Sequence, residues 1–316
     1  MMDWTDRHCR VLHRLLSRHV RLYTEMITAD AILHGGRERL LGFSQIERPV
    51  ALQLGGADPA KLAQAARIAS EYGYDEINLN AGCPSDRVQS GCFGAVLMRT
   101  PDLAYRCVAA IRAGTSVPVT VKCRIGVDEQ NPQEALPTFI DACAAAGIST
   151  FAVHARKALL SGLSPAENRE IPPLQYGLVY GLKRSRPELT IVINGGIASL
   201  DAAEEHLGFV DGVMLGRAAY QNPAILAHVD RRFFDGEPCD VNEAVRQYTD
   251  YIREQLRHGV PLNAITKHML GLFQGRRGAR LFRRHLSEHA VRKGAGVSVL
   301  LDALAFVEQP VSAVAA

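Results

Sequence analysis

Short apolar runs alternate with longer amphipathic stretches along most of the chain. The short runs are rich in Val, Ile and Leu, which is typical of parallel strands that are buried on both faces. They predict strands at Leu22–Ile27, Val50–Leu54, Glu76–Asn80, Val117–Lys122, Thr150–His154, Thr190–Asn194 and Gly212–Leu215. The stretches between them have helical periodicity and predict helices that include Pro59–Tyr72, Pro101–Arg112, Glu134–Ala146 and Leu200–His206.

This alternation indicates either a doubly wound sheet or an eight-stranded barrel. Polar residues end strand after strand, and in a barrel all of these ends meet at one mouth. They are Gln53, Asn78, Asn80, Lys122, His154 and Asn194. No Gly-x-Gly-x-x-Gly opens the first strand–helix unit, so the dinucleotide fingerprint of the Rossmann fold is missing. We therefore predict an α/β protein with a (β/α)8 TIM barrel.

Two features refine this prediction. The pattern contains seven strands, and the eighth would precede the helix predicted at Asp3–Arg18; we therefore expect the first strand to be truncated. After Gly236–Pro238 only helical patterns follow. They lie at Asn242–His258, Asn263–Leu272, Ala279–His289 and Val297–Val307. We predict a barrel domain over residues 1–237 and an all-helical domain over residues 238–316.

Composition narrows the class of protein. The chain has 316 residues, of which 47% are hydrophobic and 22% charged, and this balance excludes a disordered or fibrous protein. No apolar run is long enough to cross a bilayer and no secretory leader is visible, so we expect a cytoplasmic protein. The seven cysteines include no Cys-x-x-Cys pair, which argues against a disulfide framework or a zinc site. Cys107 and Cys143 lie in helical patterns and are expected to be buried.

The loops after the last two predicted strands suggest a phosphate site. They begin Asn194-Gly195-Gly196 and Gly216-Arg217. In barrels these loops commonly bind phosphate, because glycines let backbone N–H groups approach an anion and arginine adds a bidentate donor.

Two other strand ends carry reactive side chains. Lys122 could form a Schiff base with a carbonyl, stabilise an anionic cofactor ring, or pair with a carboxylate; these alternatives remain open from the residue alone. His154 and Gln53 are predicted to be functional only because their strand ends are expected to meet at the same mouth.

Cys83 follows a strand in the stretch Asn78–Ser85. Gly82 before it and Pro84 after it favour a rigid turn that presents the thiol. A cysteine thiol is mostly protonated at neutral pH and can act as a general acid. A nucleophilic role would need a base beside it, and no Cys-His-Asn signature is present, so we favour the acid.

The motifs together resemble the dihydrouridine synthases, flavin-dependent enzymes that reduce uridine in tRNA. The resemblance extends over nearly the whole chain. It is carried by Asn78–Pro84, which is similar to the catalytic loop, by Val121–Gly126 and by His154–Lys157 with Gly162–Leu174. The last stretch resembles the A subfamily of bacterial enzymes, which act at uridines 20 and 20a of the D-loop.

The resemblance implies FMN at the barrel mouth, with NADPH as the reductant. Gln53, Lys122 and His154 would contact the flavin ring and ribityl chain, and the Schiff-base alternative for Lys122 then falls away. Hydride would pass from flavin N5 to C6 of uracil while Cys83 protonates C5. The cofactor's phosphate would be held by Asn194, Gly195, Gly196, Gly216 and Arg217.

The resemblance also implies a binding surface for tRNA. Asn80 and Arg169 match tRNA-contacting positions on the barrel, and Arg280 and Arg283 match them near the C-terminus. Arg276, Arg280, Arg283 and Arg284 are expected on one face of a helix, where they would meet phosphates. We infer no protein partner and no membrane, and we expect a monomer.

Three departures from the family pattern stand out. Cys123 occupies a position that is often His, and Ala166 a tRNA-facing position that is often Lys, which removes one interaction with a phosphate. The family's first strand ends in Ala-Pro-Met, whereas here the backbone of Met1 and Met2 would have to line the flavin.

Two alternatives remain. One is a flavin-dependent reductase of a free pyrimidine, similar to dihydroorotate dehydrogenase, which would not need the C-terminal arginines. The other is an RNA-binding module without catalysis, which would not bind flavin.

Overall fold

The computed structural model describes residues 1–85 and 91–308, and the chain forms two compact units. The first unit comprises Met1–Asp3 and Arg21–Gly216. The second comprises Trp4–Val20 and Arg217–Ala316. The predicted boundary between residues 237 and 238 lies inside the second unit, and the functions assigned to the two domains stay predictions.

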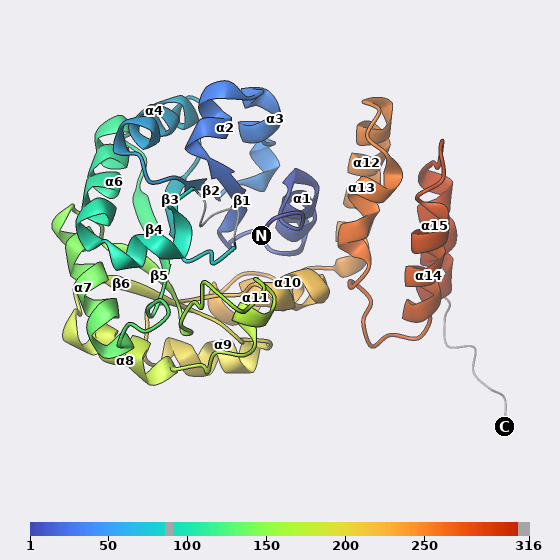
Figure 1. Ribbon diagram of the computed structural model, residues 1–316. Coiled ribbons are helices and arrows are strands. Elements are labelled where there is room, and N and C mark those ends of the chain that lie inside the picture. Colours follow the sequence, from blue (N-terminus) through green and yellow to red (C-terminus); the bar gives the residue numbers. More distant parts are fainter. Residues whose placement is uncertain (86–90, 309–316) are drawn as a thin grey trace. The chain divides into compact units, whose positions relative to one another are not determined.

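Among its described residues, the first unit is built on seven parallel strands that pair in sequence order. Figure 1 shows the curled sheet with helices outside it. The strands are β1 Leu22–Thr28, β2 Val50–Gly55, β3 Glu76–Ala81, β4 Val119–Arg124, β5 Thr150–His154, β6 Thr190–Asn194 and β7 Gly212–Met214. This is a strand–helix barrel architecture, so the predicted α/β barrel class is confirmed, with the seven strands that the sequence pattern contains.

One strand begins at a different residue from the one predicted. β4 begins at Val119 rather than Val117 and extends to Arg124. Pro118 has no N–H to donate to the ladder, so the strand starts after it, although its carbonyl accepts the Ile77 N–H at 2.9 Å. Lys122 therefore lies inside the strand, and Arg124 ends it.

The helices of the first unit follow local signals. Asp58 caps α4 by accepting the N–H groups of Ala60 and Lys61, and Pro59 occupies the first turn, where its missing N–H costs nothing. Asn131 caps α7 in the same way. The α-helices are α2 Ala29–His34, α3 Arg37–Leu41, α4 Pro59–Ser70, α6 Pro101–Gly114, α7 Pro132–Ala145, α8 Tyr176–Ser185 and α9 Leu200–Leu207; 3₁₀ turns lie at η1 Gln45–Glu47, η2 Gly94–Arg99 and η3 Glu167–Arg169.

The described part of the second unit is helical. Its elements are α1 Arg7–Leu16, α10 Arg217–Gln221, η4 Pro223–His228, α11 Val229–Phe233, α12 Val241–Arg257, α13 Leu262–Thr266, η5 Lys267–Met269, α14 Ala279–His289 and α15 Val297–Glu308. Tyr248 of α12 is fully buried and donates its hydroxyl to the His8 carbonyl of α1 at 3.0 Å. The predicted C-terminal helices are confirmed, except that Asn263–Leu272 forms two short elements.

Across residues 1–85 and 91–308, no helix combines the length and apolar character needed to cross a bilayer. Cys107 and Cys143 are fully buried, as the sequence predicted.

Candidate active site

Cys83 lies in a turn that follows β3 and is held from three elements. Asn80, in β3, accepts the N–H groups of both Gly82 and Cys83 on its Oδ1, each at 3.0 Å. Arg124 at the end of β4 donates Nε–H to the Gly82 carbonyl at 3.2 Å. The Ala95 N–H of η2 donates to the Cys83 carbonyl at 2.9 Å. The turn is therefore fixed, and its thiol is half-buried.

Gln53 and Lys122 lie on the strands that flank β3. Lys122 is in register with Asn80, and Gln53 accepts the Asn80 side-chain N–H on Oε1 at 2.8 Å. Burial, together with the positive charge of Arg124, lowers the pKa of Lys122 to about 8. The structure thus brings Gln53, Asn80 and Lys122 together on three neighbouring strands, and Asn80 joins them to the Cys83 turn.

His154 ends β5 in a strongly positive environment. Burial, followed by the charges of Arg124, Lys122, Arg156 and Arg169, lowers the pKa of His154 far below its usual range. The imidazole is therefore neutral at physiological pH, and it can accept or donate a hydrogen bond without adding charge.

The glycines after β6 leave room beside His154. Gly195 has φ +117°, and a Cβ on it would lie 2.5 Å from the His154 ring. Gly196 has φ +71°, a left-handed conformation that favours glycine. Asn194, in register with His154, donates Nδ2–H to the Met214 carbonyl at 2.7 Å, which links β6 to β7. Because glycines have no side chain, their backbone N–H groups can approach a ligand closely. Together with the clustered positive charge, they are suited to binding an anion.

The residues predicted around the phosphate loop after β7 fall into both units. The Met1 Sδ lies 3.9 Å from where a Cβ on Gly216 would stand, so the structure brings these two residues of the first unit together. Met2 is 57% exposed. Arg217, the first residue of α10, follows Gly216 in the chain and belongs to the second unit.

The positions predicted to contact tRNA differ in exposure. Asn80 is buried and its side chain is bonded inside the barrel. Ala166 is exposed at the start of η3, and Arg169 at its end is half-buried. Arg280 and Arg283 are exposed on α14, where Phe282 is fully buried on the opposite side.

The expectation that Arg276 shares the helical face of Arg280 and Arg283 was wrong. α14 begins only at Ala279, because Gly278 adopts φ +82° and interrupts the helical pattern. The Arg276 guanidinium instead lies 5.6 Å from the centre of the Phe273 ring, a cation–π arrangement.

Two arginines were missed as candidates for positioning roles. Arg124 is 3% exposed and donates to the carbonyls of Gly82, Lys157 and Asn168, which ties the Cys83 turn to the segment after β5. Arg156 donates to the Glu170 carbonyl at 2.9 Å and so holds the chain after η3. An arginine that ends a buried strand, or lies two residues beyond its end, was the available signal.

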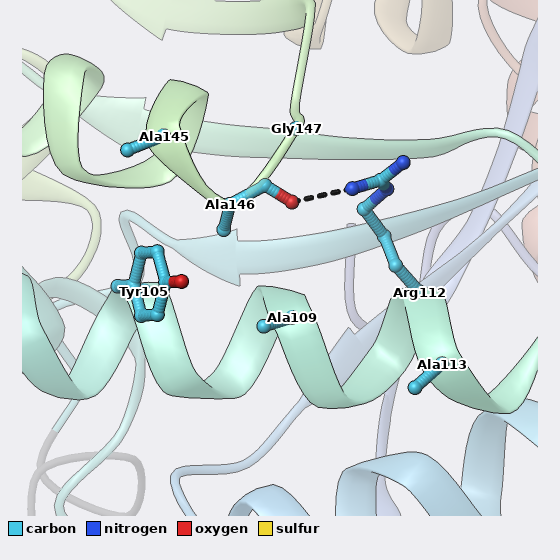
Figure 2. Close-up of a pocket in the computed structure, with 7 residues that line it drawn as sticks. All are labelled: Tyr105, Ala109, Arg112, Ala113, Ala145, Ala146 and Gly147. Carbon is cyan, nitrogen blue, oxygen red and sulfur yellow. Dashed lines mark hydrogen bonds between the residues drawn. The ribbon is translucent and has the colours of Figure 1, made fainter.

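A pocket of about 500 Å³ between α6 and α7 lies away from these residues. Figure 2 shows Arg112 of its lining donating to the Ala146 carbonyl, at 2.6 Å. Gly147 lies just before β5, so the pocket is at the amino ends of the strands, whereas Cys83 follows a carboxyl end. Its one arginine stabilises a helix end, and we assign it no chemistry.

Comparison with known proteins identifies close relatives. The family model described as dihydrouridine synthase (Dus) matches residues 1–308. The tRNA-dihydrouridine(20/20a) synthase of Xanthomonas campestris pv. campestris is 56% identical over 297 residues, which are 94% of this chain and 88% of that protein. Those of Salmonella typhimurium and Escherichia coli (strain K12) are each 57% identical over 310 residues, or 97% of this chain, and 93% and 90% of their own lengths.

Proposed function

The chain belongs to the dihydrouridine synthase family, and from this we propose that it reduces uridines 20 and 20a in the D-loop of tRNA to 5,6-dihydrouridine. The observation that carries the proposal is identity above one half, over 94% or more of the chain, to proteins named for that reaction. The site agrees chemically, because it combines a rigidly held thiol with a positive mouth. We further propose that the protein acts in the cytoplasm as a monomer.

The residues at the mouth fit an FMN cofactor. Gly195 and Gly196 have left-handed backbones, and a Cβ on Gly195 would collide with His154. This glycine cradle, continued by Asn194 and Gly216 and extended along the chain by Arg217, would hold the phosphate. Gln53, Lys122 and His154 would contact the ring and ribityl chain, and the backbone of Met1 and Met2 would line the ring.

The chain's own groups each have a task in the reaction. Bound FMN, reduced by NADPH, would supply the hydride that C6 of uracil accepts. Cys83 Sγ would give its proton to C5, and the bonds from Asn80 and Arg124 would hold the thiol in place for that transfer. Lys122, when protonated, would stabilise negative charge at the mouth. The uridine must leave its stack to reach this site, which an RNA loop makes inexpensive.

The substrate would be positioned by residues of both units. Arg169 and the exposed position of Ala166 would face the RNA on the barrel, whereas the buried Asn80 would act on the substrate through the Cys83 turn that it holds. Arg280 and Arg283 on α14 would bind phosphates, which fix register without reading sequence.

The direct test is the reaction itself. The purified protein should absorb at about 450 nm, as bound flavin does, and with NADPH and unmodified tRNA it should form dihydrouridine at positions 20 and 20a. Turnover of free uracil or orotate without product on tRNA would support the free-pyrimidine reductase instead. A colourless protein that binds tRNA would support a module without catalysis.

Cys83→Ala tests the assignment of the proton donor. The variant should keep bound flavin and NADPH oxidation but lose dihydrouridine formation, because C5 then has no acid. Cys92→Ala is the matched control, since Cys92 is an exposed thiol that lies between β3 and η2 along the chain. Dihydrouridine formation at the same rate in Cys83→Ala would remove this thiol from the mechanism.

A further inference from the structure

Buried polar side chains form a continuous hydrogen-bond chain behind the Cys83 turn. It begins next to the turn at Asn80, whose Oδ1 accepts the N–H groups of Gly82 and Cys83. Since that oxygen is committed to two donors, the amide turns its nitrogen the other way. Nδ2 of Asn80 donates to Oε1 of Gln53 at 2.8 Å.

The chain continues toward the amino end of β3. Gln53 donates Nε2–H to Oδ1 of Asn78 at 3.0 Å. Asn78 donates Nδ2–H to Oγ1 of Thr120 at 2.8 Å. Thr120 donates its hydroxyl proton to Oε1 of Glu76 at 2.5 Å. The links alternate between β2, β3 and β4, so the chain crosses the interior from the mouth to the opposite end of the strands.

Glu76 ends the chain as a pure acceptor. Besides Thr120, it accepts the Tyr23 hydroxyl at 2.8 Å on Oε1 and the Arg21 guanidinium on Oε2. Burial, with the negative charge of Glu76, raises the pKa of Tyr23 well above its usual value, so the phenol stays a donor. Three donors around a carboxylate that is 1% exposed match its ionised form, with Arg21 as the counter-ion.

The two ends impose one direction on every bond between them. An Asn or Gln amide has one accepting and one donating end. At the Cys83 turn, the backbone N–H groups require an accepting oxygen. At the other end, the Glu76 carboxylate requires donors. Turning any one amide would place like groups face to face, and water cannot compensate, because Gln53, Asn78, Asn80 and Thr120 are each at most 9% exposed.

We propose that Glu76 is a positioning residue for the active site: its carboxylate sets the orientation of the Gln53 and Asn80 amides, and through Asn80 it orders the Cys83 turn. The proposal rests on the proposed function, because it takes Cys83 and Gln53 as the groups that act. The hydrogen-bond chain itself can be tested without any RNA substrate.

Glu76→Gln keeps the size of the side chain and changes only its hydrogen bonding. A glutamine cannot accept from Thr120, Tyr23 and Arg21 with both terminal atoms, so one of these donors meets an NH₂ group. If the NH₂ turns toward Thr120, the direction reverses along the chain, and Asn80 presents its nitrogen to the N–H groups of Gly82 and Cys83. The Cys83 turn then loses the two hydrogen bonds that Asn80 accepts from it.

The readout is the rate at which iodoacetamide alkylates Cys83 in the flavin-loaded protein, resolved by peptide mass spectrometry. Glu76→Gln should raise this rate about fivefold, the factor expected when one buried hydrogen bond is lost. Thr120→Val, which breaks the chain midway, should raise it by a similar factor, whereas Thr120→Ser keeps the hydroxyl and should restore the wild-type rate.

Asp75→Asn is the matched control for a carboxylate at the same end of β3. Asp75 forms an ion pair with Arg48 and accepts the Val50 N–H, and among the described residues its side chain makes no hydrogen bond to Glu76, Thr120, Asn78, Gln53 or Asn80. This variant should lower the melting temperature but leave the Cys83 alkylation rate unchanged. A Glu76→Gln variant that behaves like Asp75→Asn would have only a local structural role, and the proposal would be overturned.

The double variant Glu76→Gln with Thr120→Val decides whether the two residues act along one path. Its alkylation rate should not exceed that of the faster single variant, because a chain broken at Thr120 cannot transmit the change at Glu76. Effects that multiply would contradict the proposal. If Glu76→Gln does not fold, the Thr120 variants still test the proposal, because equal Cys83 alkylation rates for Thr120→Val and Thr120→Ser would contradict it. If the wild type forms no dihydrouridine, the proposed function is wrong. The Cys83 alkylation rates still test the hydrogen-bond chain in that case.

Discussion

At the scale of single residues, positively charged side chains gather around His154 and Lys122 at the mouth. Lys122, Arg124, Arg156 and Arg169 all act on His154, and Arg124 also acts on Lys122. Burial, together with this repulsion, makes the lysine easier to deprotonate, and the clustered positive charge makes the site attractive to an anion. An anionic ligand would relieve the repulsion and retain the lysine proton.

Flavin binding should therefore depend on the protonation of Lys122. Its pKa in the protein is about 8, below the ordinary 10.5, and a bound anion raises it again. As pH rises from about 7.5 to about 9, the Kd for FMN should increase, approaching about tenfold per pH unit above the pKa. Fluorescence titration of the apoprotein measures this.

Lys122→Met provides the comparison. It should bind FMN more weakly at every pH, and its Kd should not change over this range because the titrating group is gone. If the wild type shows the same flat profile, Lys122 does not supply charge to the cofactor.

At the scale of elements, α14 separates an apolar from a basic face. Phe282 and Leu286 are buried, whereas Arg280, Arg283 and Arg284 are exposed. A helix places residues three and four apart on one side, so the exposed arginines form a compact positive surface. Arg276 is absent from this face because it precedes Gly278, and α14 begins only after that glycine.

Removing two of these arginines should weaken tRNA binding in a salt-dependent way. For Arg280→Ala with Arg283→Ala, we expect the slope of log K against log salt to become less steep by about two, one for each phosphate that is no longer neutralised. Filter binding at several salt concentrations measures the slope. Arg246→Ala, which removes an exposed arginine paired with Glu243 on α12, should leave it unchanged; an equal reduction in that control would indicate a general charge effect.

At the scale of the whole molecule, the N-terminal helix belongs to the same compact unit as the C-terminal helices. Asp6 caps α1 by accepting the Cys9 N–H at 3.0 Å, forms an ion pair with Lys267 of η5, and has its Oδ1 2.9 Å from Nε2 of His268. Trp4 stacks on Tyr220 with ring centres 4.3 Å apart. Residues more than 200 positions apart along the chain are thus joined in one unit.

Asp6→Asn should destabilise this unit and leave the helix cap in place, since Asn is also a good N-cap. We expect a loss of about 1–2 kcal/mol, because a hydrogen bond to a charged group is replaced by a neutral one. Trp4 is the only tryptophan, so its fluorescence during urea unfolding reports on this unit.

The pH dependence of that loss follows from the sign of the pKa shift. Burial raises the pKa of Asp6, but the hydrogen bond and charge of His268 outweigh it and lower the pKa below the ordinary 3.8. The stabilisation is therefore present above about pH 4 and disappears as the carboxyl group is protonated in acid. Wild type and Asp6→Asn should converge there; a constant difference down to about pH 2 would show that the charge of Asp6 is not the cause.

Local sequence determined much of this protein. Runs of Val, Ile and Leu placed all seven strands within two residues of their observed ends, because a buried parallel strand must be apolar on both faces. Polar residues at the strand ends predicted a shared mouth, and the motif around Cys83 predicted a catalytic thiol, a role that stays a prediction. The strand predictions succeed because their causes lie within a few neighbouring residues.

Other features were decided only by tertiary structure. The alternation of Glu76, Asn78 and Asn80 in β3 can be seen in the sequence. Their partners Gln53 and Thr120 lie on β2 and β4, and the register in which these strands pair brings the five side chains into hydrogen-bonding distance. Likewise, no local pattern indicated that α1 would pack with α12 rather than with the strands that follow it. Burial and hydrogen-bond direction depend on which segments meet in space, and that is settled by the packing of the whole chain.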